Sequence, residues 1–328
     1  MNIGIIFGGK SFEHEISIIT AFQVKNKLES LYKISMIYVD INGCIFDSSK
    51  SLLADFKQGK PKLKKINIKR LNLDILIGCM HGENGEDGYA CNFAKIYNIK
   101  YFGSDTFGSS ICLDKYKTYN YLSNNGIKMI ETYIYTYEDY LEGKKIDNFP
   151  LIIKPLLGGS SVGIEVIKSK EELTDGLIRA FDYSKKLIIQ PYIENLIEYN
   201  LALTEEDYSI LERINNKSDI FSFENKYQDS FKLMHQELTD VDKLEDFKKI
   251  ARKVYDILDL SGIVRIDFFV IDNEIYVNEI NTTPGALAMY LFDDFIEVFN
   301  KSLNYKLREE YVKYNLNYSI LKNSNINK

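Results

Sequence analysis

The chain has 328 residues, of which 45% are hydrophobic and 27% charged, and its formal net charge at pH 7 is −6. This length predicts about two domains, with three small domains as the alternative. The composition is that of a soluble globular protein with a sizeable core, and the acidic balance argues against a dedicated nucleic-acid-binding protein. The one basic run, residues 57–70, is best interpreted as a solvated loop.

The cysteines indicate a reducing compartment. The four cysteines show no Cys-x-x-Cys spacing, and Cys79, Cys91 and Cys112 lie in apolar segments, so we expect buried thiols in place of disulfides or zinc ligands. No signal peptide precedes the first strand, and no apolar run reaches the roughly 18 residues of a membrane span. We therefore expect a cytoplasmic protein that does not bind membranes.

The chain begins with "GIIFGGKS", which satisfies the phosphate-binding P-loop pattern G-x-x-x-x-G-K-[ST]. That pattern requires a strand before its first glycine, and only three residues precede Gly4. The residues after Gly4 form the expected strand themselves, so we interpret the match as chance. We expect a turn at Gly8 and Gly9 that leads into a helix starting near Ser11.

Residues 1–103 alternate between strand-like and helix-like segments. Short apolar runs predict strands at 2–9, 33–40, 73–80 and 100–103, and helical spacing predicts helices at 13–29 and 88–98. Alternation of this kind predicts a parallel sheet, in which ligands bind beyond the carboxyl ends of the strands. The segments "GGKSFEHE" and "HGENGEDG" both fall at such ends.

Residues 104–193 predict a small α+β unit. It starts with one helix over 110–126, continues with two strands that flank the loop "LLGGSSVG", and closes with a helix and a strand. The remainder, 194–328, predicts short strands, a helix over about 240–259, a strand pair and helices from about Ala288. We therefore expect a domain division at 1–103, 104–193 and 194–328.

The strand pair "GIVRIDFFVIDNEIYVNEINTTPG" carries polar residues on an apolar background. Side chains alternate between the faces of a strand, so Arg265 and Asp267 share one face, as do Glu279 and Asn281. A three-residue loop centred on Asn273 would place Asp267 opposite Glu279, whereas an even loop would separate the pairs. We expect the odd loop.

Two opposed carboxylates repel each other unless a cation lies between them. An oxygen set of Asp267, Glu279 and Asn281 suits Mg²⁺, which keeps water or phosphate oxygens as its further ligands. The alternative is an exposed strand face with incidental acids. The apolar neighbours on both strands favour the metal site.

The segment "KPLLGGSSVG" joins Lys154, at the end of a strand, to a flexible loop with two serines. Adjacent glycines expose backbone N–H groups, and a lysine adds positive charge, so this loop suits the phosphates of a nucleotide. Loops of glycine and serine are usually only turns, and the interpretation depends on the neighbouring metal site.

These segments together resemble a known family. The motifs "GGKSFEHEIS", "MHGENGEDG", "LDK", "IIKPLLGGSSVG", "KY" and "RIDFF…NEINTTPG" occur in the order and spacing of D-alanyl-D-alanine ligases, members of the ATP-grasp superfamily. The resemblance covers nearly the whole chain. It implies a mixed α/β and α+β protein with an ATP-grasp fold and an N-terminal parallel-sheet domain.

The resemblance also implies the reaction. ATP phosphorylates the carboxylate of a first D-alanine, and the amine of a second D-alanine attacks the resulting acylphosphate, in peptidoglycan precursor synthesis. Phosphoryl transfer needs charge neutralisation and alignment, and a water-poor site protects the acylphosphate from hydrolysis. The family implies ATP and two Mg²⁺ ions, with Mn²⁺ as an alternative metal, and a homodimer.

By position, the resemblance assigns Asp267, Glu279 and Asn281 to the metal and Arg265 to the transferring phosphate and the oxyanion. It places the remaining nucleotide contacts at Lys115, Lys154, Ser160, Ser161, Gln190, Tyr192, Ile193 and Glu198. Glutamine at 190 replaces the acid expected at the adenine edge, and its carbonyl can still accept a hydrogen bond from adenine.

For the substrates, the resemblance implies that Glu13 binds the ammonium of the first amino acid within a hydrogen-bonded set with Ser160 and Tyr227. His81 would lie near this substrate. Lys226 and Gly285 complete the expected substrate contacts. Each assignment has a simpler alternative: Glu13 as a helix cap, His81 as a core histidine, and residues 226–227 as ordinary surface.

Two departures from the family concern the second substrate. Tyr290 stands where the family places a serine that contacts a substrate carboxylate, and the loop after Tyr227 lacks the usual Pro-Ala pair. A loop tyrosine accompanies amine acceptors in this family, whereas a loop histidine accompanies D-lactate; His235 lies in the same loop. The alternatives are therefore a ligase with another acceptor (D-serine, D-lactate or another amino acid) and a non-catalytic nucleotide-binding regulator.

Overall fold

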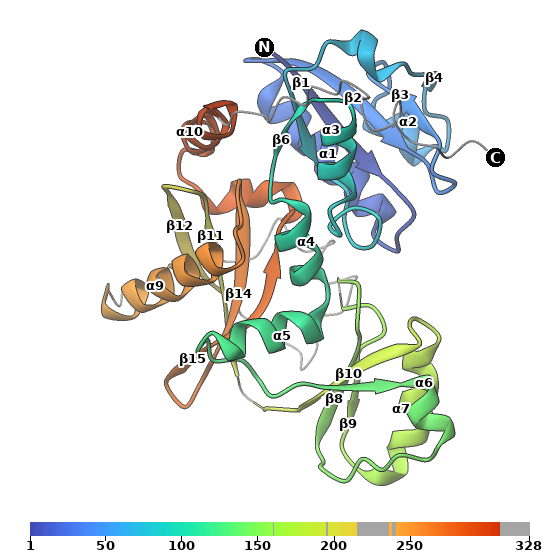
Figure 1. Ribbon diagram of the computed structural model, residues 1–328, viewed down its shortest axis with the longest axis vertical. Coiled ribbons are helices and arrows are strands. Elements are labelled where there is room, and N and C mark those ends of the chain that lie inside the picture. Colours follow the sequence, from blue (N-terminus) through green and yellow to red (C-terminus); the bar gives the residue numbers. More distant parts are fainter. Residues whose placement is uncertain (160, 195, 215–235, 238–240, 309–328) are drawn as a thin grey trace, which may run out of the picture.

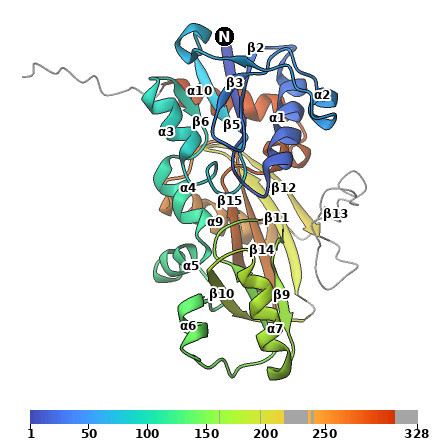
Figure 2. The ribbon, with the colours of Figure 1, turned by 90° about the vertical axis from the view of Figure 1, so that its right-hand side faces the viewer.

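The computed structural model of the protein describes residues 1–159, 161–194, 196–214, 236–237 and 241–308. Its strands form three sheets that follow one another along the long axis of the molecule (Figure 1). A six-stranded sheet lies at the N-terminal end, a five-stranded sheet lies in the middle, and a four-stranded sheet lies at the opposite end. Figure 2 shows the same order from the side.

The N-terminal sheet has the strand order β4-β3-β2-β1-β5-β6. Its strands are β1 (Asn2–Gly8), β2 (Lys33–Val39), β3 (Ile45–Asp47), β4 (Lys64–Lys65), β5 (Ile75–Gly78) and β6 (Lys100–Phe102). Its helices are α1 (His14–Leu28), α2 (Leu53–Lys57), η1 (Ile68–Leu71) and α3 (Tyr89–Ile96). Strands β2, β1, β5 and β6 pair in parallel, which confirms the expected sheet; β3 and β4 add an antiparallel edge that the sequence did not reveal.

The first glycines form a turn and not a P-loop. Strand β1 extends to Gly8, and Gly8 and Gly9 have φ angles of +93° and +90°. A Cβ atom at Gly8 would lie 2.2 Å from the carbonyl oxygen of Val39, so the turn requires glycine there. Helix α1 begins at His14, later than expected near Ser11, because the His14 N–H first closes a turn with the Ser11 carbonyl.

The helix expected over 110–126 is two helices, α4 (Thr106–Leu113) and α5 (Lys115–Asn124). Asp114 separates them with an extended backbone (ψ 99°), and its carboxylate accepts a hydrogen bond from the Lys117 N–H at the start of α5. A local N-cap thus competes with continuation of the helix. The break sets Lys115 at the first turn of α5.

The four-stranded sheet has the order β7-β10-β8-β9 and is antiparallel throughout. Its strands are β7 (Tyr133–Thr136), β8 (Leu151–Pro155), β9 (Glu165–Ile167) and β10 (Lys186–Pro191), with helices α6 (Tyr137–Leu141) and α7 (Lys170–Phe181). Strands β8 and β9 pair with each other, which confirms that two strands flank the glycine-serine loop.

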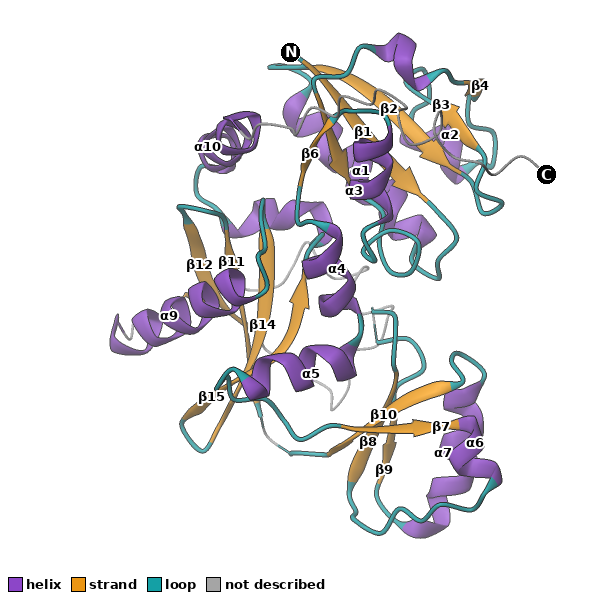
Figure 3. Cartoon of the chain, viewed as in Figure 1, coloured by secondary structure: helices purple, strands orange, loops and turns teal. Residues whose placement is uncertain are grey.

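The five-stranded sheet has the order β13-β12-β11-β14-β15 and is also antiparallel. Its strands are β11 (Ile197–Leu203), β12 (Tyr208–Ile214), β13 (Gln236–Glu237), β14 (Val264–Ile271) and β15 (Glu274–Asn281). Helix α9 (Val241–Ile257) lies against one face (Figure 3), where Phe247 packs between the rings of Tyr199 and Phe268, each 5.2 Å away. Residues of α4 and α5 share this core.

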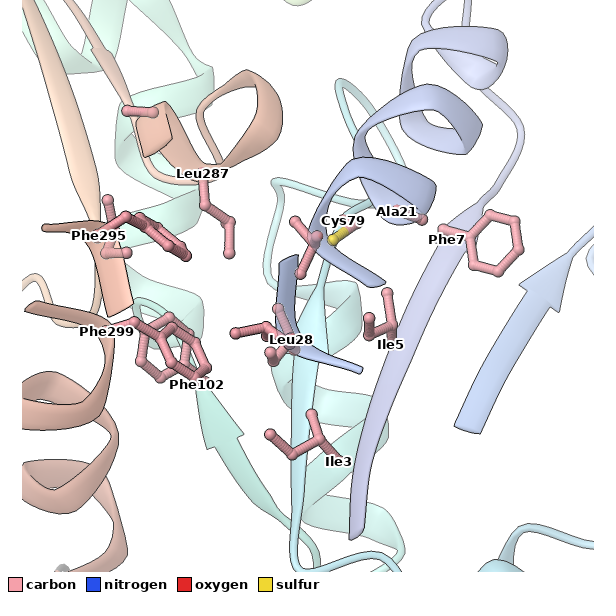
Figure 4. Close-up of a cluster of buried hydrophobic side chains, with 14 of the residues drawn as sticks. Ile3, Ile5, Phe7, Ala21, Leu28, Cys79, Phe102, Leu287, Phe295 and Phe299 are labelled. Carbon is pink, nitrogen blue, oxygen red and sulfur yellow. The ribbon is translucent and has the colours of Figure 1, made fainter. Parts of the chain in front are cut away.

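A second apolar core connects the N-terminal and five-stranded sheets. After β15 the chain forms η2 (Gly285–Leu291) and α10 (Phe295–Arg308), where the sequence predicted helices from about Ala288. Phe299 of α10 contacts Phe102 of β6 at 4.9 Å, in a cluster with residues of β1 and α1 (Figure 4). The expected division at residues 103 and 193 stays a prediction.

The four cysteines are free, and all but Cys44 are buried, as expected. Over the residues that the structure describes, no helix has the length and apolar character needed to cross a bilayer.

Candidate active site

The β14–β15 hairpin brings its polar residues to one face, by a route other than the one expected. The turn is even: only Asp272 and Asn273 form it, both with positive φ, because Ile271 pairs directly with Glu274. The expected three-residue loop was wrong.

A β-bulge restores the predicted pairing. The register shifts by one residue between Phe268 and Asp267, and Asn278 is the extra residue of β15. As a result Asp267 lies opposite Glu279, and Arg265 lies opposite Asn281. The four side chains share the face opposite α9, as the sequence indicated.

Asp267 is the most enclosed of these groups, with 5% of its surface exposed. Its oxygens accept hydrogen bonds from Arg265 Nε (2.7 Å) and Nη2 (2.9 Å), and Asn281 Nδ2 lies 3.1 Å from Oδ2. Since the amide of Asn281 donates through nitrogen, its oxygen remains as a possible ligand. A bidentate guanidinium neutralises the buried carboxylate in this arrangement.

These residues fit a hard cation. They offer two carboxylates and one amide oxygen on one face, the donor chemistry typical of Mg²⁺. In the described part of the chain, no group of three or more His, Cys, Asp or Glu side chains gathers to hold a metal ion. A metal at this hairpin would therefore take further ligands from water and from phosphate oxygens.

Lys115 connects the hairpin to the glycine-serine loop. Its ammonium lies 3.5 Å from Glu279 Oε1 and donates a hydrogen bond to the Gly158 carbonyl. The loop that follows β8 also holds Ser161 in the left-handed region (φ 59°). Lys154 lies on β8 opposite Ile188. The lysine of α5 thus brings the loop next to the predicted metal ligands.

Glu13 lies where three segments meet. It is 7% exposed and occupies the N-cap position of α1, yet its side chain makes no capping hydrogen bond within the described residues. A Cβ atom at Gly82 would lie 2.9 Å from Glu13 Oε2, and one at Gly159 would lie 3.2 Å from both carboxylate oxygens. The carboxylate therefore contacts both glycine loops, which disfavours the simple role of a cap.

His81 is 5% exposed, and its Nε2 lies 2.9 Å from Thr20 Oγ1. Burial and the nearby Arg265 lower the pKa of His81 to about 4, so the ring is neutral at pH 7. Thr20 Oγ1 also accepts a hydrogen bond from the Ala286 N–H at 3.3 Å. His81 is thus a satisfied buried histidine that connects α1 to the segment after the hairpin.

The segment after the hairpin borders the same face. A Cβ atom at Gly285 would meet no described atom within 4 Å, so this residue faces open space. Ala286, Leu287 and Ala288 all have φ near +50°. The hydroxyl of Tyr290, whose side chain is partly exposed, lies 3.5 Å from Arg265 Nη1. The tyrosine therefore stands beside the predicted phosphate-binding arginine.

The residues predicted to bind the base and ribose lie at the end of β10, in the segment after it and on β11. Gln190 Nε2 donates to Thr132 Oγ1 at 2.9 Å, so the amide nitrogen and not the carbonyl oxygen makes this contact. Ile193 lines a cavity of about 420 Å³ together with Tyr199 and residues of α9, and Glu198 is not among the lining residues.

Two further residues predicted to bind the base and ribose do not line this cavity. The Tyr192 N–H donates to the Pro150 carbonyl at 3.1 Å. Glu198 pairs with Phe269 on β14 and therefore lies on the hairpin face of the sheet. Four residues named from the sequence lie outside the described residues: Ser160, Lys226, Tyr227 and His235.

Sequence reasoning missed two polar groups of this region. Glu86 accepts a hydrogen bond from the Gly82 N–H at 2.8 Å, next to Glu13. Asn200, opposite Asp267 on β11, donates to Glu212 at 3.2 Å, and both are buried. A polar residue within the apolar strand "EYNLALT" was the available signal for Asn200.

Comparison with known proteins gives matches over nearly the whole chain. Residues 2–104 match the family described as "D-ala D-ala ligase N-terminus" and residues 115–305 match "D-ala D-ala ligase C-terminus". A D-alanine–D-alanine ligase of Helicobacter acinonychis is 36% identical, over 89% of this chain and 90% of the relative. One of Campylobacter concisus is 33% identical over 95% of both chains.

Solved structures give the same result. The crystal structure of a D-alanine–D-alanine ligase from Helicobacter pylori matches with a TM-score of 0.76 and 32% identity, over 94% of this chain and 98% of the other. The VanG D-Ala:D-Ser ligase of Enterococcus faecalis matches with a TM-score of 0.74 over 93% and 99% of the two chains. At 23% identity this second likeness concerns the fold alone.

Proposed function

Since the chain belongs to the D-alanine–D-alanine ligase family, whose members use ATP and a divalent metal ion, we propose that the face between the β14–β15 hairpin and the two glycine loops is its active site. The reaction is the ATP-dependent, ADP-forming ligation of two D-alanines, which supplies a peptidoglycan precursor. The observation that carries the site assignment is the convergence of Glu13, Lys115, Arg265, Asp267 and Glu279 from distant segments.

The first D-alanine binds with its ammonium at Glu13. A buried carboxylate attracts a cation, and an ammonium can form charge-assisted hydrogen bonds with it, so an ammonium is a chemically suitable ligand for Glu13. The contacts of Glu13 with both glycine loops support binding of this ammonium where the two loops meet. The neutral His81 adds no competing positive charge there.

ATP binds with its phosphates between the glycine-serine loop and the hairpin. Lys115 and Lys154 provide positive charge, and Ser160 and Ser161 provide hydroxyl groups to the phosphates. Asp267, Glu279 and Asn281 would hold Mg²⁺, which when bound neutralises and aligns the phosphate oxygens. Gln190, Tyr192, Ile193 and Glu198 bind the base and ribose.

Arg265 acts at the reacting carbon. The carboxylate of the first D-alanine takes the terminal phosphoryl group of ATP, and ADP leaves. The neutral amine of the second D-alanine then attacks the acylphosphate carbon, expels inorganic phosphate and loses a proton to solvent. A guanidinium held in place by Asp267 stabilises the oxyanion without reorganising, which is the efficient form of electrostatic catalysis. Ser160 and Tyr227, with Glu13, complete the catalytic set.

The acceptor is D-alanine. Curated relatives at 33–36% identity are D-alanine–D-alanine ligases, which supports this choice over D-serine and D-lactate. Gly285 leaves open space for the acceptor beside Tyr290, and Lys226 binds its carboxylate. We further propose that the site binds two Mg²⁺ ions, which Mn²⁺ can replace. We also propose that the protein is a homodimer, which light scattering in solution tests.

Phosphate release from ATP tests the function. The protein is assayed with D-alanine alone, with D-alanine plus D-serine or D-lactate, and with L-amino acids, and the product is identified by mass spectrometry. We expect release with D-alanine alone and a dipeptide product. Release with none of these substrates would remove the proposal, and a mixed product in preference to D-alanyl-D-alanine would reassign the acceptor.

A further inference from the structure

Phe12, in the turn before α1, contacts an aromatic ring from a different part of the molecule. Its ring centroid lies 6.0 Å from that of Tyr183, which follows α7, and the two rings meet edge to face at 64°. Phe12 is 74% exposed, and a single exposed apolar ring needs no explanation by itself. The contact is informative because it joins the N-terminal sheet region to the four-stranded-sheet unit, next to Glu13.

Tyr183 in turn covers one end of the glycine-serine loop. A Cβ atom at Gly163, where this loop returns to β9, would lie 2.7 Å from Tyr183 Cδ2 and 2.9 Å from Pro155 Cγ. Gly163 also has a φ of +72°, which favours glycine. The tyrosine ring therefore lies directly against this glycine while it contacts Phe12.

The residue after Phe12 reaches the other end of the loop. Both carboxylate oxygens of Glu13 would lie 3.2 Å from a Cβ atom at Gly159. Phe12 and Glu13 are consecutive, so one turn contacts Gly159 directly and Gly163 through Tyr183. The two glycines bound the part of the loop that is expected to cover the phosphates, so this turn can determine how closely the loop approaches the site.

The turn itself is held within the N-terminal region. The His14 ring donates through Nδ1 to the Gly9 carbonyl at 2.6 Å, and the Asn84 side chain donates to the Lys10 carbonyl at 3.0 Å. The main chain that leads to Phe12 is thus fixed by side chains of α1 and of the loop after β5. An aromatic contact can position a loop only from such a fixed support.

We propose that Phe12 is a positioning residue for the ligase reaction: through Tyr183 it keeps the glycine-serine loop closed over the acylphosphate of the first, donor D-alanine and so excludes water from it. The inference rests on the proposed function, because it needs an acylphosphate in this site. When the loop opens, water replaces the acceptor amine. Water attacks the acylphosphate carbon, inorganic phosphate leaves, a proton passes to solvent and D-alanine is regenerated, so that ATP is hydrolysed to ADP and phosphate without a dipeptide.

The ratio of phosphate released to dipeptide formed measures this protection. The native protein with ATP, Mg²⁺ and D-alanine should release one phosphate for each D-alanyl-D-alanine. In Phe12→Ala we expect about two or more phosphates per dipeptide, because an aromatic pair contributes roughly a two- to tenfold factor to an equilibrium. A loss of stability alone would lower the amount of active enzyme and leave the ratio at one.

Conservative and control variants separate the ring contact from other effects. Phe12→Tyr and Tyr183→Phe retain both rings and should keep the native ratio. Phe107→Ala is the matched control, since Phe107 of α4 is 54% exposed and meets the ring of Tyr121 of α5 edge to face at 6.1 Å. This variant loses an equivalent aromatic contact and should also keep the native ratio.

A double variant tests whether Phe12 acts through Tyr183. We expect the excess phosphate in Phe12→Ala/Tyr183→Ala to be no greater than in Tyr183→Ala alone. Independent increases from the two substitutions would overturn the inference, as would a native ratio in Phe12→Ala. A native protein that forms no dipeptide from D-alanine would instead remove the proposed function, and with it the reaction that Phe12 protects.

Discussion

The ammonium of Lys115 lies 3.5 Å from a carboxylate oxygen of Glu279. One residue starts helix α5 and the other lies on β15, and the same ammonium also donates to the carbonyl of Gly158 in the phosphate-facing loop. The lysine therefore neutralises a predicted metal ligand while it positions the loop. Loss of this charge is expected to affect nucleotide binding more than folding.

The Lys115→Met variant tests this relationship. We expect the KM for ATP to rise at least about tenfold, because a hydrogen bond to a charged group contributes roughly 1.5–3 kcal/mol. Steady-state kinetics at varied ATP measures the change. Lys117→Met is the matched control, since Lys117 on the same helix is exposed and pairs only with Asp114 at 3.0 Å among the described ion pairs. An equal rise in KM for both variants would contradict the role of Lys115.

The Glu279→Gln variant tests the metal assignment. We expect turnover to fall by at least about a hundredfold, as for other losses of a group that acts on transition-state charge, while thermal unfolding stays close to that of the native protein. Glu274→Gln, on the exposed tip of the same strand, weakens a surface ion pair with Lys128 and a hydrogen bond from Tyr276 and should leave turnover unchanged. Retained activity in Glu279→Gln at ordinary Mg²⁺ concentrations would refute the assignment.

His81 makes stability depend on pH. Its folded-state pKa of about 4 lies below the ordinary value of 6.5, so its contribution is complete above about pH 6.5 and is lost as the pH falls through 4. This amounts to about 3 kcal/mol at most. Thermal unfolding between pH 4 and 7 should show a steeper loss for the native protein than for His81→Gln. Parallel curves for the two proteins would exclude this explanation.

The Gly82→Ala variant tests the contact between Glu13 and the loop after β5. A methyl group there would lie 2.6 Å from Ser11 Oγ and 2.9 Å from Glu13 Oε2, so we expect a raised KM for the donor D-alanine. Gly143 has the same φ of +70°, but an added Cβ there would meet no atom of the described residues within 4 Å. Gly143→Ala therefore carries the same backbone cost, of order 1 kcal/mol, and should leave this KM unchanged. A raised KM in both variants would point to a general loss of stability.

Local patterns predicted the strands of the hairpin and the polar residues on its face. They failed to predict the length of its turn and the break between α4 and α5, because each of these depends on a single residue. The pairing of Asp267 with Glu279 was predicted from an odd loop, but the chain combines an even turn with a bulge. An odd loop and an even turn with a bulge both place these two side chains on the same face, so the alternation of polar and apolar residues cannot distinguish them. The break at Asp114 was missed because the apolar spacing continues across it. Capping hydrogen bonds do not alter that spacing.

The site itself depends on contacts between segments that no local pattern relates. The glutamate at position 13 was named by resemblance, but its contact with Gly159 follows from the placement of two different sheets. Glu86 was missed for the same reason: it stands in a quoted motif, and only the folded chain shows that its carboxylate accepts the N–H of Gly82, the glycine that Glu13 also contacts. The sequence therefore indicated which residue types form the site, but it did not indicate the distances between their side chains.

The extra residue of β15 determines which changes of length the hairpin can accept. Deleting Asn278 would leave a regular ladder in which Asp267 still faces Glu279 and Phe268 still faces Val277. Deleting Tyr276 would preserve the first pair only by turning Val277 out of the core. The hairpin therefore has a single site where the chain can shorten by one residue and keep both its interior and its acids in place, and natural length variants of this strand should concentrate there.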